Sequence, residues 1–505
     1  MYKQTPMGSS NLIWRATKNL VCDKTGTIVA KRNPSKRKGK MRLSIGICFM
    51  VLFMATRVNS FVGITWGRQQ SQQLVPSMVV DLLLQNKIPA LRLMTSANDI
   101  IEIFSATNIS ITITLGHQAF NMVNRKDLAY IWVNDRVKEP VNKGVNIVEV
   151  TVGSEPFSSS FFRETSKTYQ LVNVLKLVRG ALNDMGLGYI RTTTSHGMDV
   201  LKLTKVPSEA DFRDDIKTLM LESLEFFNQT GTPFLLNMFP IQMVREILEC
   251  PMEFGFFDNK SEFKIQDGNV TYRNAVELMI DYVAWAITKA GYPNMKIMIG
   301  QIGWPTDGYP HANIENARRF HKGLLKYLAS NKGTPLRPGP IDVFLHSLSD
   351  ENEFRSVFGA FQRHWGIYEA DGNPKYKIDF SLQDRDIYPT QAKGLVTMPN
   401  RWCKFDGDNS DKDLVNKYYN FACQEADCTR LEEGASCDGL SDDSKISYAF
   451  NAYFQKEKQK VEACDFEGLG EITAENPSVG ICQFPIEILA LQDQIGKDNS
   501  ISIRI

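Results

Sequence analysis

The sequence predicts a (β/α)8 TIM barrel followed by a small disulfide-rich domain. Between residues 61 and 348, eight short apolar segments alternate with amphipathic segments of helical periodicity. Strands that alternate with helices build a parallel sheet, and eight such units close into a barrel. Beyond residue 400, six of the nine cysteines are clustered, which is typical of a disulfide module made in an oxidising compartment. The alternatives are a doubly wound open sheet for the first region, and a zinc site or reduced thiols for the second.

The eight expected strands are short apolar runs, and the helices between them carry one apolar face. The strands are expected at residues 61–66, 90–94, 110–115, 146–153, 188–193, 233–238, 296–300 and 341–348. The helices are expected at residues 76–86, 98–106, 128–138, 169–185, 212–228, 275–290 and 314–329. The seventh strand is the most distinctive, because its apolar run ends at Gln301 and is followed by Trp304, Pro305 and an Asp-Gly turn. This pattern is expected where a buried strand reaches the mouth of a barrel.

Chemistry in such a barrel is located at the C-terminal ends of the strands. The fourth strand ends near Glu155, the sixth near Asn237, the seventh at Gln301 and the eighth near Glu351. Two carboxylates facing each other from strands four and seven would form a retaining glycosidase pair, about 5 Å apart. Aromatic residues near the strand ends are candidate stacking faces for sugar rings, with burial in the core as the alternative: Trp66, Phe239, Trp304 and Trp365.

Five motifs follow one another in the barrel region. They read GITWG at 63–67, VGSEP at 152–156, PFLLNMFP at 233–240, GQIGWPTDG at 300–308 and RHWGI at 363–367. Together they resemble motifs of the plant β-1,3-glucanases of glycoside hydrolase family 17. The resemblance implies a catalytic barrel over residues 61–385, with Glu155 as acid/base and residue 301 as nucleophile. It also implies contacts with β-1,3-glucan by Trp66, Asn237, Phe239, Trp304, Glu351 and Trp365.

The chain departs from that family at the nucleophile. Gln301 stands where the family has a glutamate, and a neutral amide can neither form the glycosyl ester nor offset oxocarbenium charge as a carboxylate does. Gln362 also replaces a glutamate, and Met94 stands where the family commonly has a tyrosine. Three interpretations remain open: a hydrolase in which Asp307 or Glu351 replaces the nucleophile, a glucan-binding protein without turnover, and a transglycosylating enzyme.

Residues 401–485 resemble carbohydrate-binding module family 43. The resemblance implies binding of β-1,3-glucan and the disulfide pairs Cys403–Cys464, Cys423–Cys428 and Cys437–Cys482, whereas spacing alone leaves fifteen connectivities open. Residues 386–400 are expected to link the two domains. Residues 486–505 are expected to be a charged tail without a lipid-anchor pattern.

The N-terminal region predicts secretion. Basic residues precede Met41, an apolar run at 43–55 follows it, and small or polar residues follow to residue 60, which is a signal-peptide layout. We therefore expect an upstream extension at 1–40 and a signal peptide at 41–60, with a signal anchor as the alternative. Secretion to the cell wall fits the four glycosylation sequons at Asn108, Asn228, Asn259 and Asn269.

Composition limits the partners and cofactors. The formal net charge of +1 gives no reason to expect nucleic acid as a partner. None of the six histidines has metal-ligand spacing, so neither a metal nor another cofactor is predicted. No stable membrane span is expected once the signal peptide is removed. No heptad pattern suggests self-association, and a monomer is expected.

Overall fold

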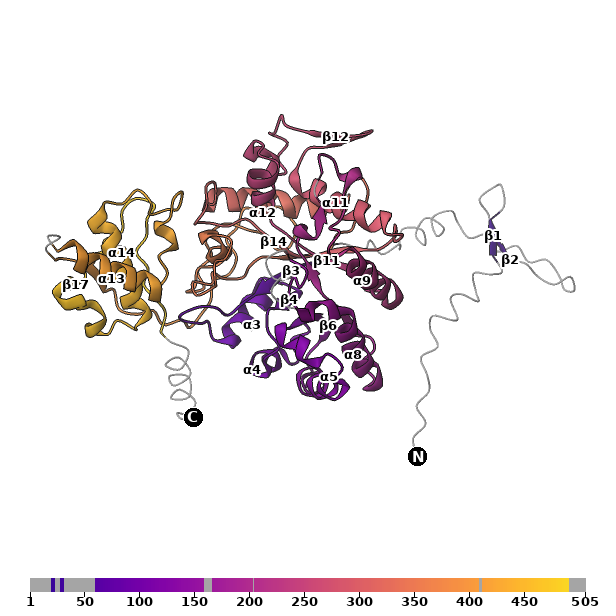
Figure 1. The fold of residues 1–505 in the computed structure, drawn as a ribbon, viewed down its shortest axis with the longest axis horizontal. Helices are drawn as coiled ribbons and strands as arrows, with labels where there is room; N and C mark the ends of the chain where they lie inside the picture. Colours follow the sequence, from indigo (N-terminus) through magenta and orange to yellow (C-terminus); the bar gives the residue numbers. More distant parts are fainter. Residues whose placement is uncertain are drawn as a thin grey trace, which may run out of the picture. The chain divides into compact units, whose positions relative to one another are not determined.

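The computed structural model describes residues 20–22, 28–30, 60–158, 166–202, 204–407 and 411–489. The chain forms two compact units, of which residues 1–59 are one; there, β1 (Leu20–Cys22) and β2 (Ile28–Ala30) pair antiparallel. Residues 60–505 are the other unit and contain the barrel and the small domain (Figure 1). The predicted extension at 1–40, the signal peptide at 41–60 and the tail at 486–505 fall mostly outside the described residues.

The barrel is built from nine parallel strand segments. Its strands pair in the order β7-β6-β5-β4-β3-β15-β14-β11-β8. They are β3 (Val62–Trp66), β4 (Ala90–Leu93), β5 (Ser110–Leu115), β6 (Ile147–Val152), β7 (Arg191–Thr193), β8 (Ser195–His196), β11 (Phe234–Met238), β14 (Ile297–Ile302) and β15 (Val343–Leu345). The segments β7 and β8 occupy the position of the predicted fifth strand.

The fifth strand closes the barrel by bonding to both of its neighbours. Its first part pairs with β6, where Thr193 lies opposite Thr151, and its second part pairs with β11, where His196 lies opposite Leu236. Only Thr194 separates the two parts. Because this one strand joins the two ends of the sheet, the nine segments form an eight-stranded barrel, as predicted.

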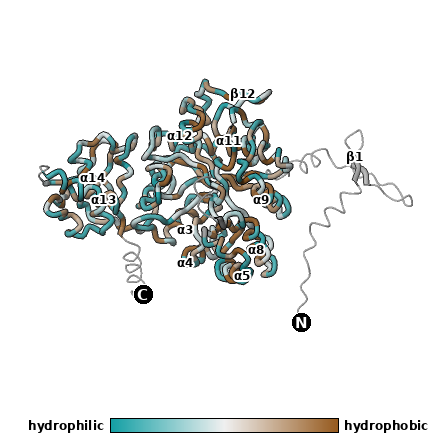
Figure 2. The backbone as a smooth tube through the Cα atoms, in the orientation of Figure 1, coloured by the Kyte–Doolittle hydropathy of each residue, from teal (hydrophilic) through white to brown (hydrophobic). Residues whose placement is uncertain are grey.

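Helices surround the sheet, and most of them bury one face, whereas α11 (Ala275–Lys289) is buried almost all round. They are α3 (Pro76–Gln85), α4 (Asn98–Ile101), α5 (Lys126–Val133), α6 (Glu139–Asn142), α8 (Leu171–Asp184), α9 (Lys217–Thr230), α10 (Pro240–Gln242), α11 (Ala275–Lys289) and α12 (Ile314–Ala329). Hydrophobic and hydrophilic stretches alternate along them (Figure 2). Helix α12 shows the spacing: it buries Ala317, Phe320, His321, Leu324, Leu325 and Leu328, which lie three or four residues apart or side by side.

Asparagine caps begin two of these helices. The side chain of Asn274 accepts a hydrogen bond from the amide of Glu277 at the start of α11, and Asn313 accepts one from the amide of Asn316 at the start of α12. Each cap satisfies one amide that has no partner inside the helix. Helix α9 ends at Gly231, whose left-handed backbone (φ 64°) suits a residue without a side chain.

The small C-terminal domain packs two helices against a two-stranded sheet. Strands β16 (Trp402–Phe405) and β17 (Gly470–Thr473) pair antiparallel beside α13 (Lys412–Glu425) and α14 (Asp442–Lys456). Its own apolar core includes Phe450 stacked on Phe466, with ring centroids 3.8 Å apart. Three disulfides cross it, in the pairs that the resemblance implies: Cys403–Cys464, Cys423–Cys428 and Cys437–Cys482.

Several predicted elements differ in extent from the structure, among them the eighth strand, which is limited to β15, and the three that follow. The predicted helix at 212–228 begins five residues later, because Phe212 lies in the short strand β10 (Asp211–Phe212) and pairs with Leu201 of β9 (Leu201–Lys202). The predicted helix at 98–106 is shorter and ends in the 3-10 turn η1 (Glu102–Phe104). The seventh strand continues to Ile302, so residue 301 lies within the strand and not after it.

Gly303 shows how closely β14 and β15 approach each other where they end. A Cβ atom at residue 303 would lie 2.1 Å from the carbonyl oxygen of His346. Backbone atoms cannot move aside as a flexible side chain can, so Gly303→Ala should destabilise the protein by about 1–3 kcal/mol or more. Urea unfolding followed by circular dichroism would measure this.

Gly180 is the matched control. It lies inside α8, and a Cβ at this position meets no atom within 4 Å. Gly180→Ala should raise the free energy of unfolding by about 0.5–1 kcal/mol through helix propensity. Equal effects of the two substitutions would contradict the close approach at Gly303.

Candidate active site

Glu155 lies just beyond the end of β6, in a sharp turn. Gly153 and Glu155 both have positive φ, 70° and 49°, and the amide of Glu155 donates to the carbonyl of Ser195 on β8. A left-handed backbone is unfavourable for a residue with a side chain and is concentrated at functional sites. The turn leaves the Glu155 side chain half-buried, with Oε2 facing the backbone of Gly197.

Asn237 is the hydrogen-bond partner of Glu155. It lies on β11, is almost fully buried, and donates from Nδ2 to Glu155 Oε1 at 2.7 Å. Burial raises the pKa of Glu155, and the nearby charge of Asp199 adds to the rise, while the Asn237 hydrogen bond and the charge of Arg92 oppose it. A raised pKa favours the protonated form of a carboxyl, which is the form that acts as a general acid.

Arg92 fixes the orientation of the Asn237 amide. It is fully buried on β4, and its Nη1 donates to Asn237 Oδ1 at 3.1 Å and to the carbonyl of Gly300 at 2.9 Å. Because the carbonyl oxygen of Asn237 accepts from Arg92, its amide nitrogen is the group that faces Glu155. The chain Arg92–Asn237–Glu155 therefore ties together β4, β11 and the end of β6.

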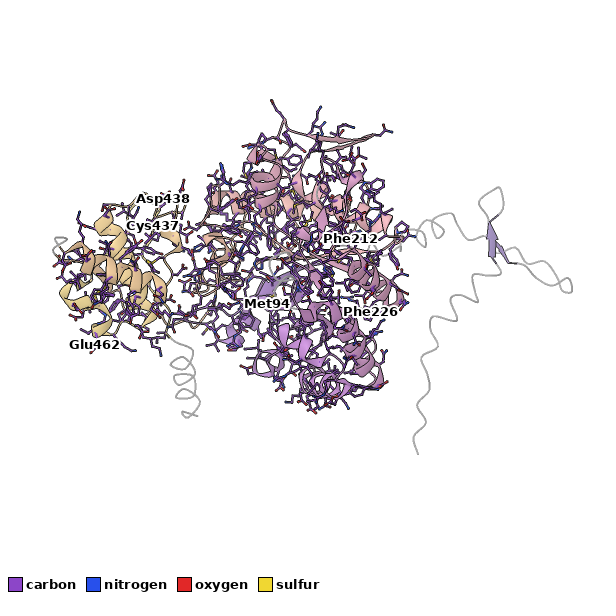
Figure 3. The ribbon with its side chains drawn as sticks, viewed as in Figure 1. Met94, Phe212, Phe226, Cys437, Asp438 and Glu462 are labelled. Atoms are coloured by element: carbon purple, nitrogen blue, oxygen red, sulfur yellow. A yellow bond between two sulfur atoms is a disulfide. The ribbon has the colours of Figure 1, made fainter. Side chains whose placement is uncertain are left out.

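Gln301 belongs to the same site. It lies on β14 directly opposite Asn237 of the neighbouring strand β11, and its side chain is 7% exposed. Its Nε2 contacts the sulfur of Met94 at 3.8 Å, a weak hydrogen bond at best, and Met94 lies in the barrel region (Figure 3). Strand pairing thus brings Gln301 beside Asn237, while the Asn237 side chain contacts Glu155. No charged partner of Gln301 appears among the described contacts.

Asp350 and Glu351 follow β15 and have opposite electrostatic environments. Burial alone would raise the pKa of Asp350, but Lys375 Nζ at 2.6 Å from Oδ2 and the neighbouring His364 outweigh it and lower that pKa to about 2. No cation among the described residues lowers the pKa of Glu351: burial, supported by the charge of Asp350, raises it to about 7. Its Oε1 accepts from the amide of Gln69, and its carboxyl packs on Gly67.

Two of the four candidate stacking residues lie in the core. Trp304 is 0% exposed, packs between Phe256 and Phe320, and donates from Nε1 to the carbonyl of His311. Trp66 is 1% exposed. A sugar ring cannot stack on a face that is already covered, so the expectation that these two residues are sugar platforms is wrong for this conformation.

The remaining two aromatic residues are adjacent. Phe239 is half-buried after β11, and its ring centroid lies 4.9 Å from that of the buried Trp365. Trp365 also contacts His346 and Phe361. Phe239 is therefore the accessible aromatic surface among the four candidates, and the ring of Trp365 packs against it.

Sequence reasoning did not identify Arg92. The available signal was a single arginine inside the apolar run Ala90–Leu93, where a charged side chain must find partners inside the barrel. The partners are distant in sequence, at Asn237 and Gly300, and only the closed barrel brings them together.

Other predicted sites are placed as follows. The four glycosylation sequons are exposed, at Asn108, Asn228, Asn259 and Asn269. Cys250 is a free, half-buried thiol. Within the described ranges, no three side chains of metal-binding type gather, and no helix has the length and apolar character needed to cross a bilayer.

Comparison with known proteins identifies the family. The family model of glycosyl hydrolases family 17 matches residues 62–380. The chain belongs to glycosyl hydrolase family 17. The X8 domain model matches residues 401–471, within the region that resembles carbohydrate-binding module family 43. The predicted family, and the barrel followed by a small disulfide-rich domain, are thus confirmed.

Curated relatives span both parts of this family 17 chain. Glucan endo-1,3-beta-glucosidase 8 of Arabidopsis thaliana is 33% identical over 455 residues, which covers 89% of this chain and 94% of that protein. Glucan endo-1,3-beta-glucosidase 5 of the same plant is 34% identical over 434 residues, covering 85% and 88%. Among solved structures, CJP38, a β-1,3-glucanase and allergen of Cryptomeria japonica pollen, is 28% identical with a TM-score of 0.59, covering 64% of this chain and 99% of that one.

The raised pKa of Glu351 predicts a pH-dependent stability for this family 17 barrel. Below a pH of about 7 the folded protein keeps a proton on Glu351 that the unfolded chain releases above its ordinary value of 4.5. The free energy of unfolding should therefore fall as pH rises from 4.5 to 7. Above pH 7, Glu351 should cause no further change. The whole contribution of Glu351 should be at most about 3 kcal/mol.

Glu351→Gln isolates this effect, because a glutamine does not titrate. Urea unfolding of both proteins between pH 4.5 and 8 should show the wild type losing up to about 3 kcal/mol more than the variant. A difference between the two proteins that stays constant with pH would contradict the assignment.

Proposed function

We propose that this chain binds β-1,3-glucan in its barrel as a member of the endo-hydrolase family, and that Gln301 blocks the covalent step of hydrolysis. The single observation that carries the proposal is the position of Gln301. It is paired with Asn237, whose amide donates to Glu155, and this supports the inference that the glutamine occupies the nucleophile position of a retaining pair.

The acid half of the reaction is supported by the geometry. Glu155 is half-buried, its pKa is raised, and Asn237 holds one carboxyl oxygen. A carboxyl in this state can protonate the leaving oxygen of a glycosidic bond. Its proton transfer would proceed only together with stabilisation of the sugar cation on the opposite side.

The nucleophilic half is not supported. In a retaining glycosidase the second carboxylate attacks the anomeric carbon and forms an ester. An uncharged amide nitrogen or oxygen at residue 301 neither attacks efficiently nor balances the positive charge on the sugar. Glu351 is an unsuitable replacement as a free carboxylate, because burial favours its protonated form up to a pH of about 7.

Ground-state binding places no such demand on residue 301. A glutamine can donate and accept hydrogen bonds to neutral sugar hydroxyls, and the half-exposed Phe239 offers a ring for stacking. The X8 domain adds a second region that resembles a β-1,3-glucan-binding module. We infer that the main function of the protein is to bind the β-1,3-glucan of the plant cell wall.

Secretion is part of this proposal. The three disulfides of the small domain are of the kind that persists in an oxidising compartment, and the four exposed sequons would be accessible to glycosylation. Both features support an extracellular or wall location, in which β-1,3-glucan is the partner.

Laminarin hydrolysis by the wild type and by Gln301→Glu tests the proposal. The loss of a catalytic nucleophile costs roughly 10⁶ in rate in a well-studied hydrolase, so Gln301→Glu should raise turnover by several orders of magnitude over the wild type. Reducing-end release is the measurement. The double variant Gln301→Glu with Glu155→Gln should fall back towards the wild-type rate.

A binding measurement distinguishes a block of hydrolysis from a failure to bind glucan. Wild type and Gln301→Glu should bind a soluble β-1,3-gluco-oligosaccharide in calorimetry, whether or not they cleave it. Wild-type turnover equal to that of Gln301→Glu would overturn the block at residue 301. An absence of binding in both proteins would overturn glucan as the ligand.

A further inference from the structure

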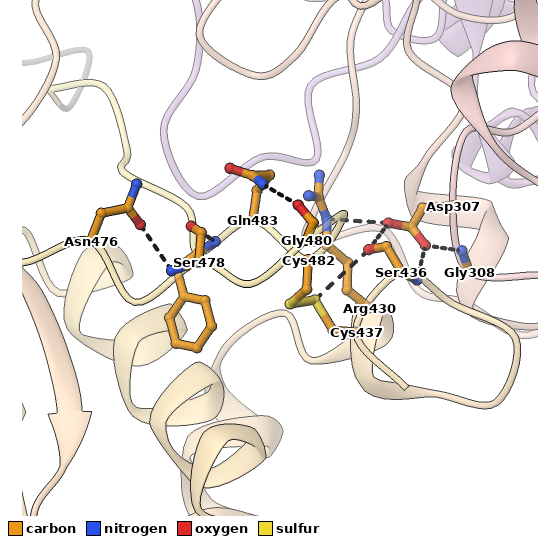
Figure 4. The surroundings of a disulfide bond; sticks show 11 residues. Asp307, Gly308, Arg430, Ser436, Cys437, Asn476, Ser478, Gly480, Cys482 and Gln483 are labelled. Atoms are coloured by element: carbon orange, nitrogen blue, oxygen red, sulfur yellow. Dashed lines mark hydrogen bonds and ion pairs between the residues drawn. A yellow bond between two sulfur atoms is a disulfide. The ribbon is translucent and has the colours of Figure 1, made fainter. Parts of the chain in front are cut away.

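The small domain contacts the barrel just beyond β14. Asp307 lies in the turn that follows this strand, and its carboxylate accepts hydrogen bonds from the amide and the hydroxyl of Ser436 in the small domain (Figure 4). The amide of Gly308 donates to the same carboxylate, and Arg430 approaches it with Nε 3.7 Å from Oδ2. Asp307 is only 6% exposed, so this charge is satisfied largely by donors from the other domain.

A second polar contact lies beyond β15. Arg363 Nη1 donates to Asp427 Oδ1 at 2.9 Å, and His364 Nε2 lies 2.8 Å from the hydroxyl oxygen of Thr429. The Thr429 hydroxyl donates its single proton to Asp427, so it accepts from His364, whose Nε2 is therefore a donor. Two adjacent barrel residues and two nearby residues of the small domain thus form one continuous network.

These small-domain residues belong to one loop, residues 427–437, which we call the docking loop. Both ends of the loop are crosslinked: Cys428 is bonded to Cys423, and Cys437 is bonded to Cys482. The disulfides limit the conformations of the loop before it meets the barrel. Ordering costs on contact are therefore low, which is the general advantage of a preorganised surface.

The chain on either side of the small domain is also attached to the barrel. Glu487 accepts hydrogen bonds from Ser71 and from Asn352, both of which belong to the barrel part of the chain. The next residue, Ile488, is 1% exposed and packs with the barrel core. Glu487 and Ile488 also pair with the connecting segment 386–400 through the amide of Met398 and a bridge to Thr397.

The connecting segment is itself hydrogen-bonded to the barrel part of the chain. Thr390 donates its amide to Asn86 Oδ1 at 2.8 Å, and Asn86 lies at the end of α3. A short connection that is attached along its length keeps the docking loop at a high effective concentration beside Asp307. Weak individual contacts can then add up to a stable arrangement.

We infer that the small domain is locked onto the barrel by the docking loop, so that the two domains move and unfold as one body. The surface that receives the loop includes Asp307, Arg363, His364 and Glu369, which lies 3.7 Å from Arg430, at the same end of the barrel as Gln301. This arrangement does not depend on glucan binding, and it differs from a module that swings on a flexible tether.

The full-length double variant Thr429→Val with Ser436→Ala tests the lock. It removes both hydroxyls that face the barrel, while all three disulfides remain. Wild type should show one calorimetric unfolding transition, whereas the variant should show two. Trypsin cleavage after the exposed Lys393 should accelerate by about tenfold or more, because proteolysis follows the population of the opened form. Small-angle scattering should show a larger radius of gyration for the variant.

Thr473→Val is the matched control. The Thr473 hydroxyl accepts a hydrogen bond from Glu475, inside the small domain, and Thr473 pairs only with Trp402 of β16. This variant should keep the wild-type transition, cleavage rate and radius. Arg430→Gln, which retains both hydroxyls, should lie between the wild type and the double variant. Two transitions in the wild type, or a double variant that matches Thr473→Val in all three measurements, would overturn the lock.

Discussion

The buried cation of Arg92 is the interaction on which the site depends. Burial lowers its pKa to about 10, and the nearby carboxyls of Glu149 and Glu155 oppose that fall, so the guanidinium stays charged at neutral pH. A buried charge is tolerated only where partners satisfy it. Here Nη1 is satisfied by Asn237 and by the carbonyl of Gly300, which precedes residue 301. Nε and Nη2 make no hydrogen bond within the described residues, and the nearby charges of Glu149 and Glu155 provide the remaining compensation. One side chain therefore orients the amide beside Glu155 and holds the strand that carries Gln301.

The charge of Arg92 also determines the electrostatic effect of having an amide instead of a carboxylate at residue 301. Two unit charges about 5 Å apart interact by roughly 3 kcal/mol at an effective dielectric constant near 20. A carboxylate at residue 301 would attract both Arg92 and a sugar cation, whereas an amide adds no charge to those of Glu149 and Glu155 around Arg92. Under the proposed function, the site would favour a neutral bound sugar over a cationic transition state.

Most of the fold, and part of the site, could be predicted from local patterns in the sequence. Apolar runs and helical faces indicated the eight strands, and the strand ends indicated Glu155 and Gln301, because burial and periodicity are local properties. The core position of Trp304 was not predictable, since an indole near a strand end suits either a core or a sugar platform, and only its packing between Phe256 and Phe320 decides. The role of Arg92 depends on contacts with residues 145 and 208 positions away, which no local pattern reveals.

The motifs of the barrel contain residues that contact the small domain as well as residues of the candidate site. A matching motif is therefore not by itself evidence of catalysis. Asp307 of GQIGWPTDG and the Arg363–His364 pair of RHWGI contact the small domain, while Gln301 in the first of these motifs lies in the candidate site. A segment can thus meet the demands of docking whatever chemistry occurs at its strand end. The fold and the docking surface follow from packing and hydrogen bonds, whereas in the proposed function activity depends on the charge at residue 301. The presence of the motifs therefore supports the family of this chain more strongly than it supports hydrolysis.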